Sequence, residues 1–175
     1  MKEVRKMSET LYFAYGSNMN LSQMAFRCPD AEVVGPVRVD GYRLVFCGNT
    51  GGTGVATILL QPGFHVDGLL WRIDETAEQN LDHYEGYPYL YKKEEITVHG
   101  QGLPAQKAMV YTMNEPYRSQ PALPSEQYLH GILRGCKQNG ISQRPVMEAV
   151  KWTEQNLPEQ PSLFPKRPKP RGPVR

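Results

Sequence analysis

The stretch Tyr12-Phe13-Ala14-Tyr15-Gly16-Ser17-Asn18 joins a run of aromatic and small residues to a tripeptide typical of turns. Leu11–Tyr15 has the composition of a short β-strand, which Gly16-Ser17-Asn18 ends. Such a turn gathers backbone N–H groups, a hydroxyl and an amide, and its glycine lets a ligand approach the backbone closely. The segment predicts a strand that ends in a small anion-binding or oxyanion-binding turn, although a plain structural turn has the same pattern.

Strand patterns dominate the chain from this point to residue 113. Asp40-Gly41 is a strong hairpin signal, and Gln61-Pro62-Gly63 and Gly100-Gln101-Gly102 indicate further turns. Runs rich in β-branched, aromatic and other apolar residues flank these turns at Val33–Val39, Tyr42–Cys47, Val55–Leu60, Val66–Ile73, Tyr89–His99 and Gln106–Met113.

Helix signals are fewer and gather toward the end. Asn20, Asp74, Ser125 and Ser142 are N-cap residue types, and they predict helices over 20–27, 75–85, 125–138 and 142–156. Gly86 and Asn139-Gly140 stand where helices commonly end. Strands that precede helices, without β-α-β alternation, predict an α+β fold with a mixed, mostly antiparallel sheet.

Length and charge indicate one domain with a basic tail. The 175 residues suggest a single domain over 11–157, after a flexible N-terminus at 1–10. Residues 158–175 hold six prolines and five basic residues against one acidic residue, a charge of +4, so they predict disordered or polyproline-like chain, or a ligand for a proline-binding partner. The net charge is +2, so the body carries −2, which argues against a nucleic-acid-binding domain.

Several functional classes lack their sequence signals. No apolar run reaches the ~20 residues of a membrane span, and no signal peptide is predicted, so no membrane partner is expected. Cys28, Cys47 and Cys136 are odd in number and widely spaced, which predicts free thiols in a reducing cytoplasm. The four histidines show no metal-ligand spacing, and the glycine-rich stretch 48–54 lacks the Lys-Ser/Thr pair of a phosphate loop. We therefore expect neither a metal nor another cofactor.

Two residues are candidates for catalysis. Ser17 would need a converging His and Asp to act as a nucleophile, and the G-x-S-x-G motif is absent around it. Glu85 is predicted in the last helical turn, where the helix dipole, Asp82 and neighbouring tyrosines would all raise its pKa and suit it to acid–base work near neutral pH. An exposed glutamate at a frayed helix end remains the alternative.

Together these segments resemble the γ-glutamylcyclotransferase family. Residues 12–19 are similar to its Tyr-Gly-Ser-Asn signature, and Glu85-Gly86 resembles its catalytic glutamate and the glycine that follows. Further similarity lies at Tyr111-Thr112-Met113, Pro124–Tyr128 and Lys137–Gly140, in consistent order from residue 11 to 157. Tyr-Gly-Ser-Asn is more similar to the γ-glutamyl-amino-acid or related bacterial-type branch than to the glutathione-directed branch.

The resemblance implies a mixed, mostly antiparallel sheet or small barrel with flanking helices, and an enzyme that needs no cofactor. The expected reaction cyclises a γ-glutamyl group to 5-oxoproline and releases an amino acid or amine, as in glutathione metabolism. Glu85 is implied as the catalytic base. Substrate-binding residues are implied at Tyr12, Phe13, Ala14, Tyr15, Gly16, Ser17, Asn18, Tyr91, Tyr111 and Tyr128, with plain packing equally open for Tyr91 and Tyr111.

Two other functions remain open from the sequence. The chain could bind γ-glutamyl or similar small ligands without turnover, or it could be a Ser17-dependent amide hydrolase that releases glutamate through an acyl-enzyme. The expected partner is a small-molecule γ-glutamyl substrate, with neither nucleic acid nor membrane, and the protein is expected to be a cytoplasmic monomer or homodimer. The sequence leaves the leaving group of the substrate open.

Overall fold

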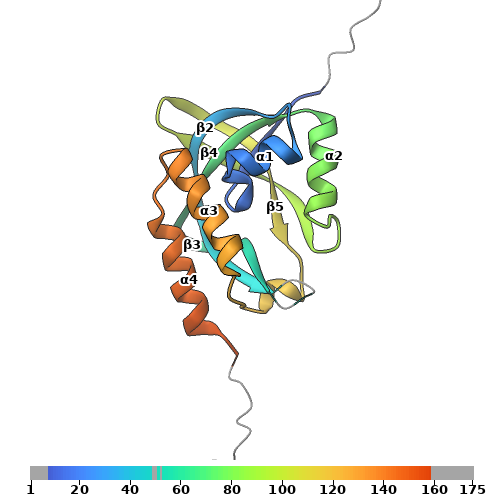
Figure 1. Cartoon of the computed structure of the whole chain (residues 1–175). Coiled ribbons are helices and arrows are strands. Elements are labelled where there is room, and N and C mark those ends of the chain that lie inside the picture. The colour runs from blue at the N-terminus through green and yellow to red at the C-terminus, as the bar shows by residue number, and fades with distance from the viewer. Residues whose placement is uncertain (1–7, 49–50, 52, 159–175) are drawn as a thin grey trace, which may run out of the picture.

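The computed structural model describes residues 8–48, 51 and 53–158, and these residues form a closed β-barrel with flanking helices (Figure 1). The strands are β1 (Thr10–Ala14), β2 (Glu32–Gly48), β3 (Gly54–Ile73), β4 (Tyr91–Gly100) and β5 (Leu103–Met113), in the barrel order β1-β3-β2-β4-β5. All neighbours pair antiparallel except β1 and β5, which are parallel and close the barrel. The predicted α+β class with a mixed, mostly antiparallel sheet or small barrel is confirmed.

The hairpin predicted at Asp40-Gly41 is wrong. β2 runs through Gly41, and β3 likewise runs through Gln61-Pro62-Gly63, so two long strands replace four short ones. The pairing shifts from Asp40↔His65 to Tyr42↔Leu60, which places a bulge opposite an outward excursion of β3. Gly41 has φ +79°, so the turn-like sequence marks a bend in a strand and not its end. Long strands curve around a small barrel at such bulges.

The helix caps match the sequence prediction closely. Helices α1 (Leu21–Arg27), α2 (Glu75–Tyr84) and α3 (Glu126–Gln138) begin after Asn20, Asp74 and Ser125, whose side chains each accept a hydrogen bond from a backbone N–H of the first turn. Helix α4 (Arg144–Asn156) begins after Gln143, one residue later than predicted, with Pro145 in its first turn. Short 3₁₀ turns, η1 (Ser17–Met19) and η2 (Tyr117–Ser119), complete the chain.

The helices surround one apolar core. In Figure 1, α3 and α4 lie on one side of the barrel and α2 on the other, with α1 beside η1. The core fills the barrel and extends under the helices, and its largest fully buried side chains include Phe13, Phe46, Leu69 and Ile132. The barrel therefore holds β1 and the turn after it rigidly against α3.

The described residues contain no helix that is both long and apolar enough to cross a membrane. Cys28, Cys47 and Cys136 are all buried free thiols. The prediction of a flexible N-terminus falls on residues 1–10, of which 1–7 lie outside the described residues and Thr10 begins β1. The predicted tail lies, apart from Pro158, outside the described residues as well, and the predicted domain boundaries stay predictions.

Candidate active site

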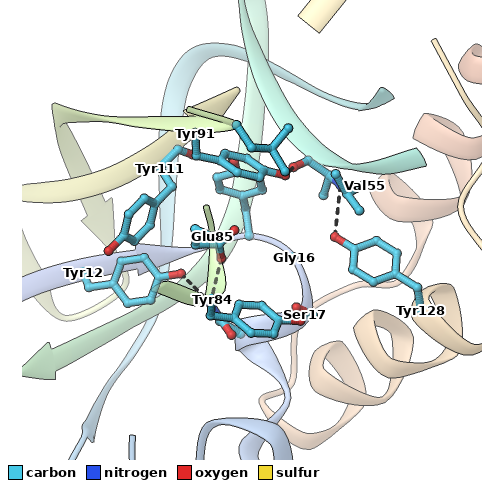
Figure 2. Close-up of a pocket in the computed structure, with 13 residues that line it drawn as sticks. Tyr12, Gly16, Ser17, Val55, Tyr84, Glu85, Tyr91, Tyr111 and Tyr128 are labelled. Atoms are coloured by element: carbon cyan, nitrogen blue, oxygen red, sulfur yellow. Dashed lines mark hydrogen bonds between the residues drawn. The ribbon is translucent and has the colours of Figure 1, made fainter. Parts of the chain in front are cut away.

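A pocket of about 240 Å³ opens beside the end of β1 (Figure 2). It is smaller than the ~300–1,000 Å³ of sites for drug-sized ligands, so it suits a small metabolite. Nine of the residues singled out from the sequence line it, together with four others. The thirteen are Tyr12, Tyr15, Gly16, Ser17, Asn18, Val55, Ala56, Tyr84, Glu85, Leu90, Tyr91, Tyr111 and Tyr128.

The end of β1 and the turn η1 form one wall of the pocket. Side chains alternate along β1, so Tyr12 contributes to the pocket while Phe13 is fully buried, with its ring packed against Gly68. Ala14 is buried as well and does not line the pocket. Phe13 and Ala14, which the resemblance implied as substrate-binding residues, therefore both lie in the core. Strand alternation accounts for Phe13 only, since Ala14 lies on the same face of β1 as Tyr12.

The turn itself is held by backbone and side-chain contacts. The amide of Met19 donates to the Gly16 carbonyl (3.1 Å), and the Trp71 indole Nε1 donates to the Asn18 carbonyl (3.0 Å). The first amides of a helix have no partner within that helix, and at η1 they belong to residues that line the pocket. A Cβ on Gly16 would stand 3.3 Å from the Cβ of Ala56 and 3.5 Å from the Tyr128 hydroxyl, so the glycine keeps the pocket open.

Glu85 enters the pocket because α2 ends at this point. The Asp74 cap fixes where α2 begins, and Glu85 is its C-cap residue, with its amide bonded to the Leu81 carbonyl (2.8 Å). Gly86 follows with φ +64°, a conformation that strongly favours glycine and turns the chain away from the helix. The Glu85-Gly86 pair therefore aims the carboxylate while ending the helix.

The environment of Glu85 favours proton transfer near neutral pH. Burial raises the pKa of its carboxyl group to about 7, while the charge of Arg27 and a hydrogen bond from Asn18 act in the opposite direction. The Asn18 Nδ2 donates to Glu85 Oε1 (3.2 Å) and to the Tyr12 hydroxyl (2.9 Å). The predicted pKa increase is present, but its cause is burial. Asp82, which the sequence suggested as a cause, is instead paired with Lys93.

Two tyrosines share the backbone of one residue on β3. The Tyr91 hydroxyl donates to the Ala56 carbonyl (2.6 Å), and the Tyr128 hydroxyl accepts from the Ala56 amide (3.0 Å). Tyr128 therefore keeps its own hydroxyl proton for another acceptor, whereas Tyr91 has used its proton. Tyr12 is in the same situation as Tyr128: the Tyr12 oxygen accepts a hydrogen bond from Asn18, and the Tyr12 hydroxyl proton stays free.

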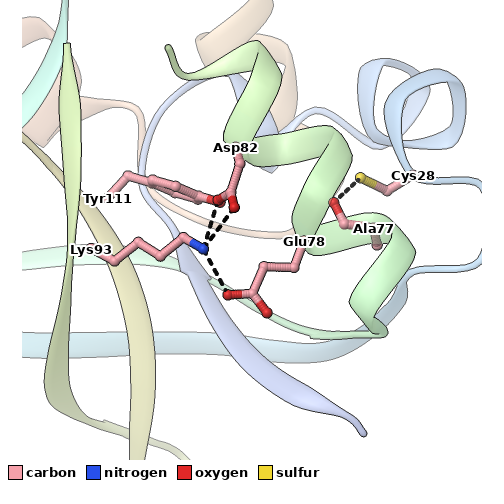
Figure 3. Close-up of polar contacts among 6 residues, drawn as sticks. All are labelled: Cys28, Ala77, Glu78, Asp82, Lys93 and Tyr111. Carbon is pink, nitrogen blue, oxygen red and sulfur yellow. Dashed lines mark hydrogen bonds and ion pairs between the residues drawn. The ribbon is translucent and has the colours of Figure 1, made fainter. Parts of the chain in front are cut away.

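Tyr15 and Tyr111 donate to the protein and not toward the pocket. The Tyr15 hydroxyl donates to the Tyr111 carbonyl (2.5 Å), and the Tyr111 hydroxyl donates to Asp82 Oδ1 (2.6 Å). Lys93 Nζ pairs with Asp82 (2.8 Å) and Glu78 (3.0 Å), so a charged cluster anchors Tyr111 to α2 (Figure 3). Burial raises the pKa of five of the six tyrosines that line the pocket, 12, 15, 91, 111 and 128, which keeps their hydroxyls protonated.

Sequence reasoning missed Arg27 and Tyr84 in this region. Arg27 Nη1 donates to Asn18 Oδ1 (2.5 Å) and Ser17 Oγ (3.2 Å), and its guanidinium stacks on the Tyr84 ring at 3.6 Å from the centroid. The only signal in the sequence was an arginine at the end of a predicted helix, where a basic residue is common for helix-dipole reasons. Tyr84 was seen only as an aromatic neighbour of Glu85.

The residues that the structure describes form neither a Ser–His pair in the pocket nor a metal site. None of the four histidines lines the pocket, so Ser17 has no imidazole partner there. Within the same residues, no group of three or more His, Cys, Asp or Glu side chains could hold a metal ion.

Comparison with known proteins identifies the family. The family model described as gamma-glutamyl cyclotransferase, AIG2-like, matches residues 12–130, which contain every side chain that lines the pocket. The chain belongs to this family. The resemblance seen in the sequence, including its enzymatic nature and its γ-glutamyl substrate class, is confirmed.

Similar proteins that are named γ-glutamylcyclotransferase support the same assignment. The chain is 35% identical to the γ-glutamylcyclotransferase of Bos taurus over 138 residues, which are 75% of this chain and 72% of the relative. It is 34% identical to the Homo sapiens protein of that name over the same shares. A solved structure named gamma-glutamyl cyclotransferase has a TM-score of 0.70 and 29% identity and covers 89% of this chain and 92% of its own.

Proposed function

We propose that Glu85 moves the protons in the γ-glutamylcyclotransferase reaction of this chain. In this reaction the α-amine of a γ-glutamyl group attacks the γ-carbonyl carbon of the same group. A new C–N bond closes the five-membered ring of 5-oxoproline, and the bond from the γ-carbon to the leaving nitrogen breaks. Because both reacting groups belong to one molecule, a bent substrate held in a small pocket gains a large effective molarity.

One carboxylate is sufficient for the proton transfers. Glu85 accepts a proton from the α-ammonium group, which frees the amine for attack, and delivers this proton to the leaving nitrogen. The attacking nitrogen loses a second proton as the ring closes, and this proton passes through Glu85 to the released amine, which leaves as an ammonium ion. The enzyme thus returns to its starting state. A carboxyl pKa of about 7 supports both roles, because the group is partly ionised at neutral pH and is not too weak an acid to return the proton. The pocket supplies no competing carboxylate among its lining residues.

Charge stabilisation is assigned to the wall of the pocket that the end of β1 and η1 form. We assign the amides at the start of η1 to the substrate carboxylate and to the carbonyl oxygen that becomes negative during attack. The free hydroxyl protons of Tyr12 and Tyr128 are further donors to these oxygens. Loss of one oxyanion donor typically lowers the rate by ~10²–10³-fold. Tyr91 and Tyr111 position the walls, since their protons are already donated to the protein.

The single observation that carries this proposal is the hydrogen bond between Asn18 and Glu85. It joins the end of the Tyr-Gly-Ser-Asn turn to the carboxylate that ends α2, across 67 positions of sequence. We propose in addition that the protein works in the cytoplasm as a monomer or homodimer, on small molecules and without nucleic acid or membrane. The buried free cysteines are consistent with a reducing compartment.

Mass spectrometry of products tests the proposal. The purified protein is incubated with γ-glutamyl amino acids and γ-glutamyl amines, and 5-oxoproline is followed for the wild type, Glu85→Gln and Glu75→Gln. Glu75 is an exposed residue of the same helix and serves as the matched control. We expect 5-oxoproline from the wild type and the control and almost none from folded Glu85→Gln.

The other products have defined meanings. Glutamate in place of 5-oxoproline would indicate hydrolysis and would favour Ser17 as a nucleophile. Binding of the γ-glutamyl compounds without any product would favour a protein that binds these ligands without turnover. Full activity of Glu85→Gln would contradict the role of Glu85.

A further inference from the structure

Arg27 contacts the turn η1, which forms one wall of the pocket, but does not itself line the pocket. It is the last residue of α1 and reaches Ser17, Asn18 and Tyr84 with one guanidinium group. We propose that Arg27 is a positioning residue, which fixes the Asn18 amide so that its nitrogen, and not its oxygen, faces Glu85. This inference rests on the proposed function of Glu85.

The argument begins with the polarity of an amide side chain. An asparagine amide has one accepting oxygen and one donating nitrogen, whereas a guanidinium group can only donate. The contact from Arg27 Nη1 to Asn18 Oδ1 therefore determines which end of the amide points each way. The opposite end, Nδ2, then meets two acceptors, Glu85 Oε1 and the Tyr12 oxygen.

A reversed Asn18 amide would disturb the site in two ways. Its oxygen would face the Glu85 carboxylate, and two acceptors without a proton between them repel each other. The Tyr12 hydroxyl would donate its proton to the reversed amide and lose it for the substrate. The Arg27 contact prevents both effects without touching a reacting atom.

Arg27 is itself held by α2, the helix that carries Glu85. Its guanidinium stacks on Tyr84, the residue before Glu85, and its carbonyl accepts from Asn80 Nδ2 (3.2 Å). No carboxylate among the described residues forms an ion pair with Arg27, so its donors remain committed to the turn and to Tyr84. Arg27 thus links the turn η1 to the end of α2, the two parts of the site.

The charge of Arg27 contributes to the same end. Arg27 is the cation that acts on Glu85, against burial, which favours the neutral carboxyl group. Among the described residues, five tyrosines also interact electrostatically with Glu85; they lie on β1, directly after β1, and on β4, β5 and α3. Their raised pKa values keep them neutral, and Asp82 on α2 is paired with Lys93. These tyrosines are Tyr12, Tyr15, Tyr91, Tyr111 and Tyr128.

The test compares pH profiles of turnover for Arg27→Gln, Arg27→Lys and the control Arg134→Gln, which changes an exposed arginine of α3. In Arg27→Gln we expect kcat/KM at pH 7 to fall about 10- to 100-fold, the range for losing hydrogen bonds to charged groups. The acidic limb should move to higher pH by about 1 unit, because the carboxylate loses a nearby cation. KM should change little.

Arg27→Lys separates charge from geometry and covers the case in which Arg27→Gln folds poorly. Lysine keeps the cation but not the planar fork, so the acidic limb should return toward that of the wild type while kcat stays reduced. Asn18→Ala should cost little further activity in the Arg27→Gln background, since both changes remove one arrangement.

Three results would overturn the inference. A large rise in KM with an unchanged pH profile would mean that Arg27 binds the substrate directly. Additive losses for Asn18→Ala and Arg27→Gln would show that Arg27 does not act through Asn18. Wild-type turnover of a folded Arg27→Gln or Arg27→Lys variant would remove the role altogether. Glu85→Gln is assayed in parallel. If Glu85→Gln stays active while Arg27→Gln loses turnover, the role proposed for Glu85 is wrong, but the loss in Arg27→Gln still shows that Arg27 supports the reaction.

Discussion

Replacing Glu85 with glutamine should stabilise the folded protein at alkaline pH while it removes activity. The carboxyl pKa is about 7 in the folded protein and 4.5 as its ordinary value. Between these values the unfolded chain ionises and the folded protein does not, so each rise in pH favours the unfolded chain. Glutamine has almost the same shape and carries no ionisable group, so it escapes this effect.

The magnitude follows from the difference between the two pKa values. Above pH 7 the carboxyl group is ionised in both the folded and the unfolded state, and the difference between the two pKa values then lowers the stability of the wild type by at most about 3 kcal/mol. Glu85 lines an open pocket and is only partly shielded from solvent, which screens the effect, so we expect the advantage of the variant to grow by about 2 kcal/mol from pH 5 to pH 8. Below pH 4.5 the carboxyl group is protonated in both states and the gain disappears.

Urea unfolding of the ligand-free protein at a series of pH values measures this gain. The free energies of unfolding of wild type, Glu85→Gln and the control Glu75→Gln are compared at each pH. The reasoning requires a difference that grows with pH for Glu85→Gln and stays flat for the control. A difference independent of pH would refute it, because Glu85 would then have the same proton affinity folded and unfolded.

Three further changes probe the supports of the pocket. Tyr128→Phe removes the partner of the Ala56 amide and a donor to the pocket, so we expect kcat to fall about tenfold and stability to fall by about 1–3 kcal/mol, measured by steady-state kinetics and urea unfolding. Gly135→Ala places a Cβ 2.7 Å from the Asn20 amide nitrogen, so α3 must move from η1, at about 1–3 kcal/mol in a thermal melt. Asp74→Ala removes the α2 cap and should lower stability by about 1 kcal/mol, with unfolding of α2 followed by hydrogen exchange.

The sequence predicted the ends of the elements better than their continuity. Asn20, Asp74 and Ser125 cap helices as their residue types indicate, because capping is a local interaction between neighbouring residues. Gly41 led to the wrong prediction of a hairpin, because a glycine at positive φ occurs both in hairpin turns and in β-bulges. Only the partner strand decides between the two, and its position is not a local property.

The site shows the same division. Glu85 and the turn at Gly16–Asn18 were found from local patterns together with the resemblance, and both line the pocket. Arg27 was not found, because its contacts depend on how α1 packs against α2 and η1. The directions of the Tyr91 and Tyr111 hydroxyl protons could not be predicted either, since their acceptors, Ala56 and Asp82, lie far away in sequence.

The two tyrosines at Ala56 recognise a peptide group and not a side chain. A small substitution at position 56 would leave both acceptor and donor in place, so the identity of this residue tolerates change. A slip of β3 by one residue against β2 would instead displace Tyr91 and Tyr128 together. The register of β3 against β2, which no single side chain encodes, thus determines where Tyr91 and Tyr128 stand and how far apart their two walls of the pocket lie.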